Sequence, residues 1–338
     1  MKKILNSPVF NGVLILLIAF LVVRLSLNQN FDDTFRIISS ANFSWVIFGL
    51  LIIALMYLAW GYALVVYANL LGHSLSLVRG SALAVIGAFG SGITPSSTGG
   101  QLFQLMAIRK MGVNVADAAS ILWIDFLIYQ IVMIVMVLAL LLFRLSHFLG
   151  ISGLFTMVII GFILNSFVLV FLFILAKSNK FHNWVANRGI HILHRFKLIK
   201  SPERTLSKIE KALKRFTHCL DILIHNKKVV FLGIVMNIIR LLLLFSFPYI
   251  IAKALKAPIT YKSFYDVLAL SSFVMMINVF IPLPGASGGT ELTFVGMFST
   301  IIESSYLTPL MLIWRFMTYY LVMIVGAIWF IYYKRKVL

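Results

Sequence analysis

Two short stretches rich in proline and glycine interrupt this chain and limit what it can fold into. The first lies at Thr94–Gln101 and the second at Ile281–Glu291, and both contain Pro-x-x-(Ser/Thr)-Gly-Gly. Proline removes a backbone donor and clashes with the turn before it, and glycine adds backbone freedom, so neither stretch suits the middle of a straight helix. The sequence therefore predicts two breaks built in the same way.

The segments around the breaks have the composition of membrane sequence. The chain is 61% hydrophobic and only 12% charged, whereas a soluble domain has about 25% charged residues. Its net charge of +19 comes from basic patches between apolar runs, which is typical of topology signals rather than of a nucleic-acid surface. A lone Cys219 excludes an intrachain disulfide and a cysteine-based zinc site. We predict an all-α integral membrane protein without a nucleic-acid partner.

Each apolar flank of a break is about a dozen residues long, too short for a hydrocarbon core that needs about 20. Two half-length helices are therefore expected to form a re-entrant hairpin around each break. Six full transmembrane helices are expected besides the two hairpins, which makes eight if the hairpins are counted as spans. These spans are predicted over 9–27, 45–71, 114–143, 153–176, 229–252 and 308–333. Residues 28–44 are predicted to form a polar loop, and Thr308-Pro309 to start the last span.

The basic residues predict the orientation. With the N-terminus in the cytoplasm, 21 Lys and Arg lie in cytoplasmic segments and five in outer loops, as the positive-inside rule expects. Both termini are then cytoplasmic, and the hairpins enter from opposite faces. The single polytopic domain, 1–338, would contain two inverted units, about 45–143 and 229–333. Such units place a transport site at the midplane, between broken helices.

Between the two units lies a basic segment, 177–228. Within it Ser201-Pro202-Glu203 is expected to open a helix, and the apolar residues that follow recur at helical spacing, at Leu206, Ile209, Leu213, Phe216, Leu220 and Leu223. One apolar stripe with lysines beside it indicates a helix (203–224) that lies on anionic inner-leaflet lipid or packs under the bundle. A helix that docks a partner protein is the alternative.

The breaks supply the first set of candidate ligand-binding residues. A half-helix begins after each one, so free backbone N–H groups and the positive end of the helix dipole face the membrane centre. Two such ends would suit the phosphate of a lipid head group. The residues concerned are Thr98, Gly99, Gly100, Gln101, Pro284, Ser287, Gly288 and Gly289. The alternative is that these small residues simply allow tight helix packing.

Four charges within the apolar segments are the second set: Asp125, Arg240, Glu291 and Arg315. Each costs roughly 2.5–3.5 kcal/mol at the bilayer centre, so each should face the protein interior or a cavity. One interpretation is ion pairing, for example Glu291 with Arg240 and Asp125 with Arg315. The other has an arginine bind a lipid phosphate while an acid binds a cationic head group or a coupled proton. No catalytic motif occurs in a usable context, so we expect no enzyme activity, metal or cofactor.

The breaks also carry a resemblance. Thr94-Pro-Ser-Ser-Thr-Gly-Gly-Gln, Leu283-Pro-Gly-Ala-Ser-Gly-Gly-Thr-Glu and Trp314-Arg315-x-x-Thr318-Tyr319-Tyr320 resemble the transmembrane-region family of lysylphosphatidylglycerol synthases. This is the flippase-like half of the bacterial multiple peptide resistance factor. The resemblance covers most of the chain. One departure is that a Glu-Arg pair often follows the first hairpin in the family, whereas Asp125 stands here without an adjacent arginine, which bears on the substrate.

The resemblance implies a module of the bacterial cytoplasmic membrane that moves an aminoacylated or other polar phospholipid between leaflets. Full-length relatives carry a soluble domain that transfers lysine to phosphatidylglycerol, and no such domain is expected in a chain that ends at Leu338. A second copy of the chain or a separate synthase is then a candidate partner. A small-solute or ion-coupled transporter and a membrane scaffold for an envelope enzyme are the alternative functions.

Overall fold

The computed structural model describes residues 31–94, 97–143, 152–177, 202–278 and 281–335, and within them all regular structure is helical. The predicted first span, 9–27, lies outside these residues. The first unit contains α4 (Phe43–Leu70), α5 (Leu77–Gly92), α6 (Gly100–Lys110) and α7 (Val115–Phe143). The second contains α13 (Lys227–Ala254), α14 (Ser263–Asn278), α15 (Gly289–Phe298), α16 (Ser304–Arg315), the π-helix η2 (Phe316–Tyr320) and α17 (Leu321–Arg335). Before and between the units are α3 (Phe31–Ser39), α9 (Ser152–Lys177) and α12 (Pro202–His225).

The described helices confirm an all-α membrane protein. Among them α4, α7, α13 and the continuous stretch Ser304–Arg335 are long and apolar enough to cross a bilayer. The helix α9 occupies the span predicted over 153–176. Both breaks are confirmed as well, because α5 ends at Gly92 before α6 begins at Gly100, and α14 ends at Asn278 before α15 begins at Gly289.

Two predicted boundaries were wrong. Part of the polar loop is the helix α3, where Asp33 pairs with Arg36 at 3.1 Å one turn later and acidic residues in the first turn offset the helix dipole. The last span begins at Ser304 rather than at Thr308-Pro309. Proline removes only one backbone donor, and the apolar side chains of Leu307 and Leu310 are buried on both sides of it.

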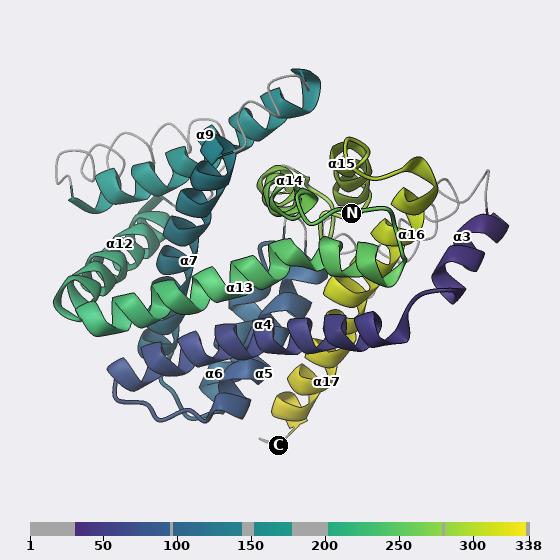
Figure 1. Ribbon diagram of the computed structural model, residues 1–338. Helices are drawn as coiled ribbons and strands as arrows, with labels where there is room; N and C mark the ends of the chain where they lie inside the picture. Colours follow the sequence, from purple (N-terminus) through teal and green to yellow (C-terminus); the bar gives the residue numbers. More distant parts are fainter. Residues whose placement is uncertain (1–30, 95–96, 144–151, 178–201, 279–280, 336–338) are drawn as a thin grey trace.

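The two units repeat one packing pattern. The helices α4–α7 form the first set and α13–α16 the second, counted in chain order. In each set the first and the third helix both pack on the second and the fourth. The first helices of the units, α4 and α13, lie side by side (Figure 1) and antiparallel. At one end Asn42 donates its N–H to the carbonyl of Ala254 at 2.7 Å. Toward the other end a side chain at Gly233 would collide with the Tyr67 hydroxyl.

Small residues allow the helices around α5 to approach closely. A side chain at Gly61 of α4 would collide with the backbone of Ser81, and one at Gly326 of α17 with the carbonyl of Val85. Such contacts are typical of packing between membrane helices, where small residues let backbones come together. They hold the first hairpin between α4 and α17.

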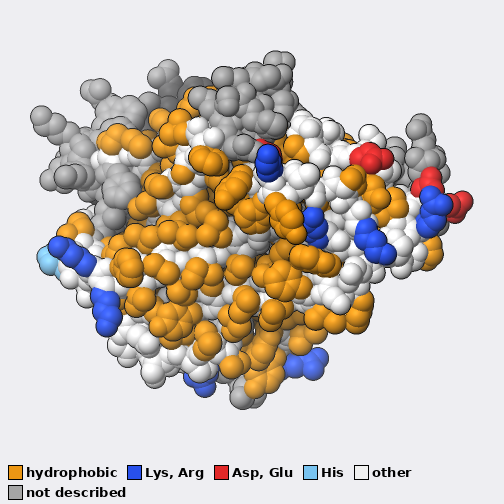
Figure 2. Space-filling view, viewed as in Figure 1, with side chains coloured by type: hydrophobic (Ala, Val, Ile, Leu, Met, Phe, Trp, Pro, Cys, Tyr) orange, Lys and Arg blue, Asp and Glu red, His pale blue; other side chains and the backbone are white. Residues whose placement is uncertain are grey.

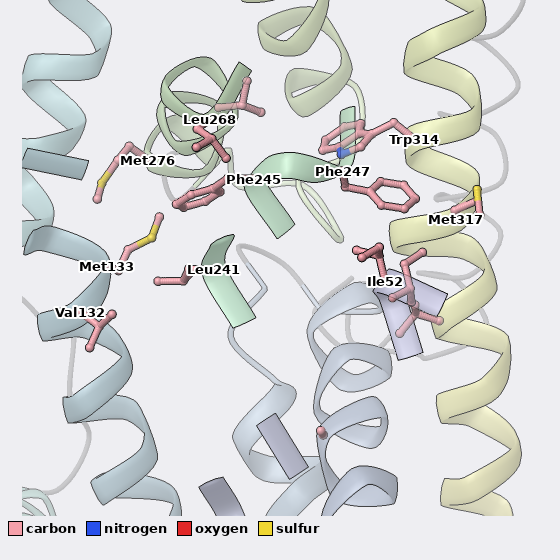
Figure 3. Packing of buried hydrophobic residues seen from close by; sticks show 14 of the residues in the cluster. Ile52, Val132, Met133, Leu241, Phe245, Phe247, Leu268, Met276, Trp314 and Met317 are labelled. Carbon is pink, nitrogen blue, oxygen red and sulfur yellow. The ribbon is translucent and has the colours of Figure 1, made fainter. Parts of the chain in front are cut away.

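The core that joins the units is centred on α13. Phe245 and Phe247 are two residues apart and therefore project from nearly opposite sides of the helix. Phe245 lies among side chains of α7 and α14, whereas Phe247 faces Trp314 of α16 and Met317 of η2 (Figure 3). Both phenylalanines are fully buried. One helix thus packs against both units.

The outer face suits a bilayer. Figure 2 shows a broad hydrophobic surface over α4 and α13, with basic side chains gathered at its rim. The exposed hydrophobic side chains of these two helices include Leu51 and Leu55 of α4 and Phe231 of α13. An apolar surface of this extent would be unusual on a soluble monomer. It is the expected surface of helices in contact with lipid.

The basic helix α12 packs on α7, α9 and α13. Cys219 is fully buried there, with its sulfur 3.9 Å from the carbonyl oxygen of Ser120, whereas Lys211 and Lys214 are exposed. This agrees with the prediction of a helix packed under the bundle, and contact of its lysines with anionic lipid stays a prediction.

Candidate functional site

The two break loops share one unusual backbone angle. Ser97 and Ala286 occupy equivalent places, two residues after Pro95 and Pro284 in the sequence, and their φ angles are +55° and +52°. Few residues other than glycine adopt such angles. The loops differ two residues later, where Gly99 has a φ of −84° and Gly288 a φ of +86°.

The breaks of the two hairpins touch. The N–H of Gly285 points to the carbonyl of Thr94 at 3.4 Å, and the Tyr319 hydroxyl donates to the carbonyl of Gly92 at 2.8 Å. The same hydroxyl occupies the space that a side chain at Gly285 would need. Three chain segments from both units thus meet at one point, which we call the junction (Gly92–Thr94, Gly285–Ser287 and Tyr319).

A buried ion pair lies at the junction. Glu291 Oε1 is 2.8 Å from Nε of Arg315, and Glu291 Oε2 accepts the N–H of Gly288 at 2.7 Å. Nη2 of Arg315 donates to the carbonyl of Gly285 at 2.8 Å and lies 3.3 Å from the Ser287 hydroxyl. The guanidinium also stacks over the Tyr319 ring, 3.9 Å from its centre. Through these contacts Glu291, Arg315 and Tyr319 stabilise the backbone of the second break.

The ion pair corrects two predictions. Glu291 pairs with Arg315 and not with Arg240, and Asp125 does not pair with Arg315. It also changes the interpretation of the α15 N-terminus. The carboxylate of Glu291 already accepts an N–H there, so the protein supplies the anion that a lipid phosphate was expected to supply.

At the first break a hydroxyl replaces the carboxylate. Thr94 Oγ1 accepts the N–H of Gly99 at 2.8 Å and donates to the carbonyl of Gly90, also at 2.8 Å. Side chains at Gly99 and Gly100 would collide with Thr94 and Ser91. A side chain at Gly289 of the second break would collide with Ile281. At these glycines the geometry favours tight packing over the close approach of a ligand.

The remaining break residues differ in exposure. Thr98 and Gln101 are exposed, Pro284 and Ser287 are buried, and Gly288 has a φ of +86° that favours glycine. The accessible polar side chains of the predicted set therefore lie at the first break.

A second charged cluster lies between α4, α7 and α13. The guanidinium of Arg240 lies over the Trp60 ring, 3.7 Å from its centre, and 4.6 Å from the centre of the Tyr129 ring. Trp60 Nε1 donates to Asp125 Oδ2 at 2.9 Å. The Asp125 carboxyl is within the electrostatic range of Arg240, and its Oδ1 is buried without a hydrogen-bond partner. We call these four residues the Arg240 cluster.

Comparison with known proteins agrees with this architecture. A family model described as "Lysylphosphatidylglycerol synthase TM region" matches residues 10–326. The chain belongs to this family. It is also similar to a "UPF0104 membrane protein" of Archaeoglobus fulgidus, with 24% identity over 301 residues that cover 87% of this chain and 88% of the relative.

In this member of the synthase TM region family, the predicted residues fall into two places. Glu291, Arg315 and Ser287 meet at the junction, whereas Asp125 and Arg240 form the other cluster. Within the described residues no group of three side chains is suited to hold a metal ion.

Sequence reasoning missed the aromatic residues of both clusters. Tyr129 and Tyr319 each contact an arginine and each follow a charge at the same spacing, as Asp125-Phe-x-x-Tyr129 and Arg315-Phe-x-x-Tyr319. This repeat was the available signal. Trp60 had no such signal, because it is one of many aromatic residues in an apolar span.

Proposed function

We propose that this family member moves a polar or aminoacylated phospholipid between the leaflets of the cytoplasmic membrane, as a flippase-like translocase. The observation that carries the proposal is the junction, where two broken helices from repeated units meet inside the bundle. Helices interrupted at depth are tolerated where they line a site, and in inverted repeats they are where transport sites are built. The proposal places both termini in the cytoplasm and involves no bond-making step and no cofactor.

The two charged clusters would have different tasks. Glu291 and Arg315 would keep the second break in its shape, since each is bonded to the loop itself. The Arg240 cluster would receive the head group, since its arginine stacks on aromatic rings and is half-buried. Rocking of one unit against the other would then expose that site to the other leaflet, while the acyl chains stay in the lipid.

The apolar outer face supports a lipid over a small solute. Large hydrophobic side chains on α4 and α13 are exposed on the same helices that carry the Arg240 cluster, including Leu58 and Leu242. Acyl chains could follow this surface while the head group enters between the helices. A small-solute or ion-coupled transporter would not need such a route.

A scaffold for another protein is the second candidate. The exposed lysines of α12, Lys211 and Lys214, favour it, because a basic helix face can bind an acidic partner as well as anionic lipid. Replacing both lysines by glutamine would abolish partner binding and leave lipid movement intact if the helix only docks a protein.

The test is reconstitution of the purified chain in liposomes with a fluorescent phospholipid in both leaflets. An impermeant reductant added outside should bleach the outer-leaflet signal in empty vesicles and nearly all of the signal in vesicles with the protein. Bleaching that stays at the empty-vesicle level would exclude lipid translocation.

A matched pair of glycine variants links the activity to the breaks. Gly288 and Gly72 both have positive φ angles, +86° and +80°, so Gly288→Ala and Gly72→Ala each place an alanine where glycine is favoured. Gly72 lies in a turn where a side chain would meet nothing. Gly288→Ala should slow lipid movement and Gly72→Ala should not. Equal rates in the two variants would argue against a role for the junction.

A further inference from the structure

A buried carboxylate oxygen without a partner lies in the Arg240 cluster. Asp125 Oδ1 is among the few buried side-chain oxygens of the described residues that make no hydrogen bond. The side chains of Asp125, Tyr67 and Asn237 are all more than nine-tenths buried. Tyr67 interacts electrostatically with Asp125 and Arg240 and is within hydrogen-bonding reach of the Asn237 side chain, so the three side chains belong to one region.

An unpaired carboxylate oxygen inside the bundle is unfavourable. A buried polar group without a partner loses its hydration and gains no hydrogen bond in return. Trp60 donates only to Oδ2 of Asp125, and the amide nitrogen of Asn237 is used within its own helix, where it donates to the carbonyl of Gly233 at 2.9 Å. The unpaired Asp125 oxygen, near a charged arginine without a hydrogen-bond acceptor, therefore indicates that something polar binds here.

The arginine is prepared for an anion. Stacking on Trp60 and Tyr129 engages the faces of the guanidinium, and its N–H donors point outward in the plane of the group. Within the described residues no acceptor contacts them. A phosphate could therefore bind in the bidentate manner that arginine favours.

The acid beside it is prepared for a cation. Asp125 Oδ1 has no partner, Trp60 donates to the other oxygen of the same carboxylate, and the rings of Trp60 and Tyr129 both lie against Arg240. A carboxylate with aromatic rings is the usual environment for an ammonium group. A purely anionic ligand would be repelled by Asp125, and a simple cation by Arg240.

We propose that the Arg240 cluster, with Tyr67 and Asn237, binds a zwitterionic phospholipid head group. Its phosphate contacts the N–H edge of Arg240, and its ammonium contacts Asp125 Oδ1. The inference rests on the proposed function and specifies the substrate class of that site. Lipid rather than a soluble zwitterion is favoured because Tyr62 and Ile239, on the same stretches of α4 and α13, expose apolar surface.

Binding to the full chain in detergent tests the inference without requiring transport. The probes are dihexanoyl phosphatidylethanolamine, dihexanoyl phosphatidylglycerol and soluble phosphoethanolamine, each titrated by calorimetry. We expect the ethanolamine lipid to bind about tenfold more tightly than the glycerol lipid, since only the ethanolamine lipid offers an ammonium group for a charge-assisted hydrogen bond. Phosphoethanolamine should bind far more weakly than its lipid.

Two variants separate the two contacts. Asp125→Asn should bring the two lipids to within about twofold of each other, because it removes the ammonium partner and keeps the phosphate partner. Arg240→Gln should abolish binding of both lipids. Arg240→Lys keeps the charge without the planar guanidinium, and it serves as the second variant in case Arg240→Gln does not fold. Arg79→Gln, at an exposed residue early in α5, is the control and should leave both affinities unchanged.

The outcomes divide clearly. Equal binding of the two lipids to the wild type, or a preference that survives Asp125→Asn, would overturn the zwitterion site. Phosphoethanolamine that binds as tightly as its lipid would overturn the lipid source. A clear lipid preference combined with no lipid movement in liposomes would support this site and overturn the proposed translocation instead.

Discussion

Two arginines in apolar helices have opposite surroundings in this protein. Arg315 is buried with Glu291, the Gly285 carbonyl and the Ser287 hydroxyl as its polar contacts. Arg240 is half-buried between two aromatic rings, and no acceptor in the described part of the chain contacts it. Both stack over a tyrosine that follows a charged residue at the same spacing. The difference is that Arg315 has an acid within ion-pair distance and two further polar contacts, whereas Arg240 has none of these in the described part of the chain.

The contrast teaches where to look for a ligand in such a fold. A charge that the protein has fully paired contributes to shape, because removing its partner leaves a buried charge uncompensated. A charge that is oriented but unpaired is available for binding. By this criterion we infer that the junction is structural and propose the Arg240 cluster as the binding site.

The strongest test of the contrast is Glu291→Ala. The variant leaves Arg315 buried without its acid and the Gly288 N–H without its acceptor, and the expected loss of stability is about 3–5 kcal/mol. Thermal unfolding of the purified protein in detergent would measure it. A variant as stable as the wild type that has lost only lipid movement would show instead that Glu291 serves the ligand.

Arg240→Gln should cost much less stability. The change removes two cation–π contacts, which contribute about 0.5–2 kcal/mol in total. It also removes a partly buried charge that has no hydrogen-bonded acid. The same unfolding measurement applies, with lipid binding as the second readout. If the loss matched that of Glu291→Ala, the two arginines would have the same structural role and the contrast would fail.

Thr94→Val compares the two breaks directly. It removes the hydroxyl that accepts the Gly99 N–H and keeps the shape of the side chain, so the loss should be about 1 kcal/mol, as for other helix caps. Comparing the thermal unfolding of this variant with that of Glu291→Ala would show which break contributes more to the stability of the protein. A loss as large as that of Glu291→Ala would mean that both breaks are held equally firmly.

The smallest effect is expected for Tyr319→Phe. The ring stays over Arg315, and only the hydrogen bond to the Gly92 carbonyl is lost, which costs about 0.5–1.5 kcal/mol. Because this bond joins the two units, the rate of lipid movement should change more than the stability. An unchanged rate would mean that the bond does not limit the motion of the units.

Much of the architecture could be predicted from local chemistry. The prolines and glycines at 94–100 and 282–289 stop a helix whatever surrounds them, so both breaks were predictable. The amphipathic pattern likewise indicated α12. The positive φ angles at Ser97 and Ala286 were not predicted, because neither residue is a glycine.

The partners of the buried charges could not be predicted in this way. Depth along a helix is set by the sequence, but the direction in which a side chain points depends on how the helices rotate and pack. Arg315 reaches Glu291 because α16 packs on α15, and Arg240 reaches Trp60 because α13 packs on α4. The π-helix directly after Arg315 changes the direction in which the following side chains point, and no residue propensity indicated it.

The buried sulfur of Cys219 makes the orientation of the units directly measurable. It is the only cysteine of the chain and is fully buried where α12 packs on α7, so a membrane-impermeant thiol reagent should leave the natural protein unmodified. Single cysteines introduced at Leu77 and Lys262, exposed residues near the starts of α5 and α14, would then report their side of the membrane without a cysteine-free background. Modification of the two from opposite sides would show that one hairpin opens to each compartment.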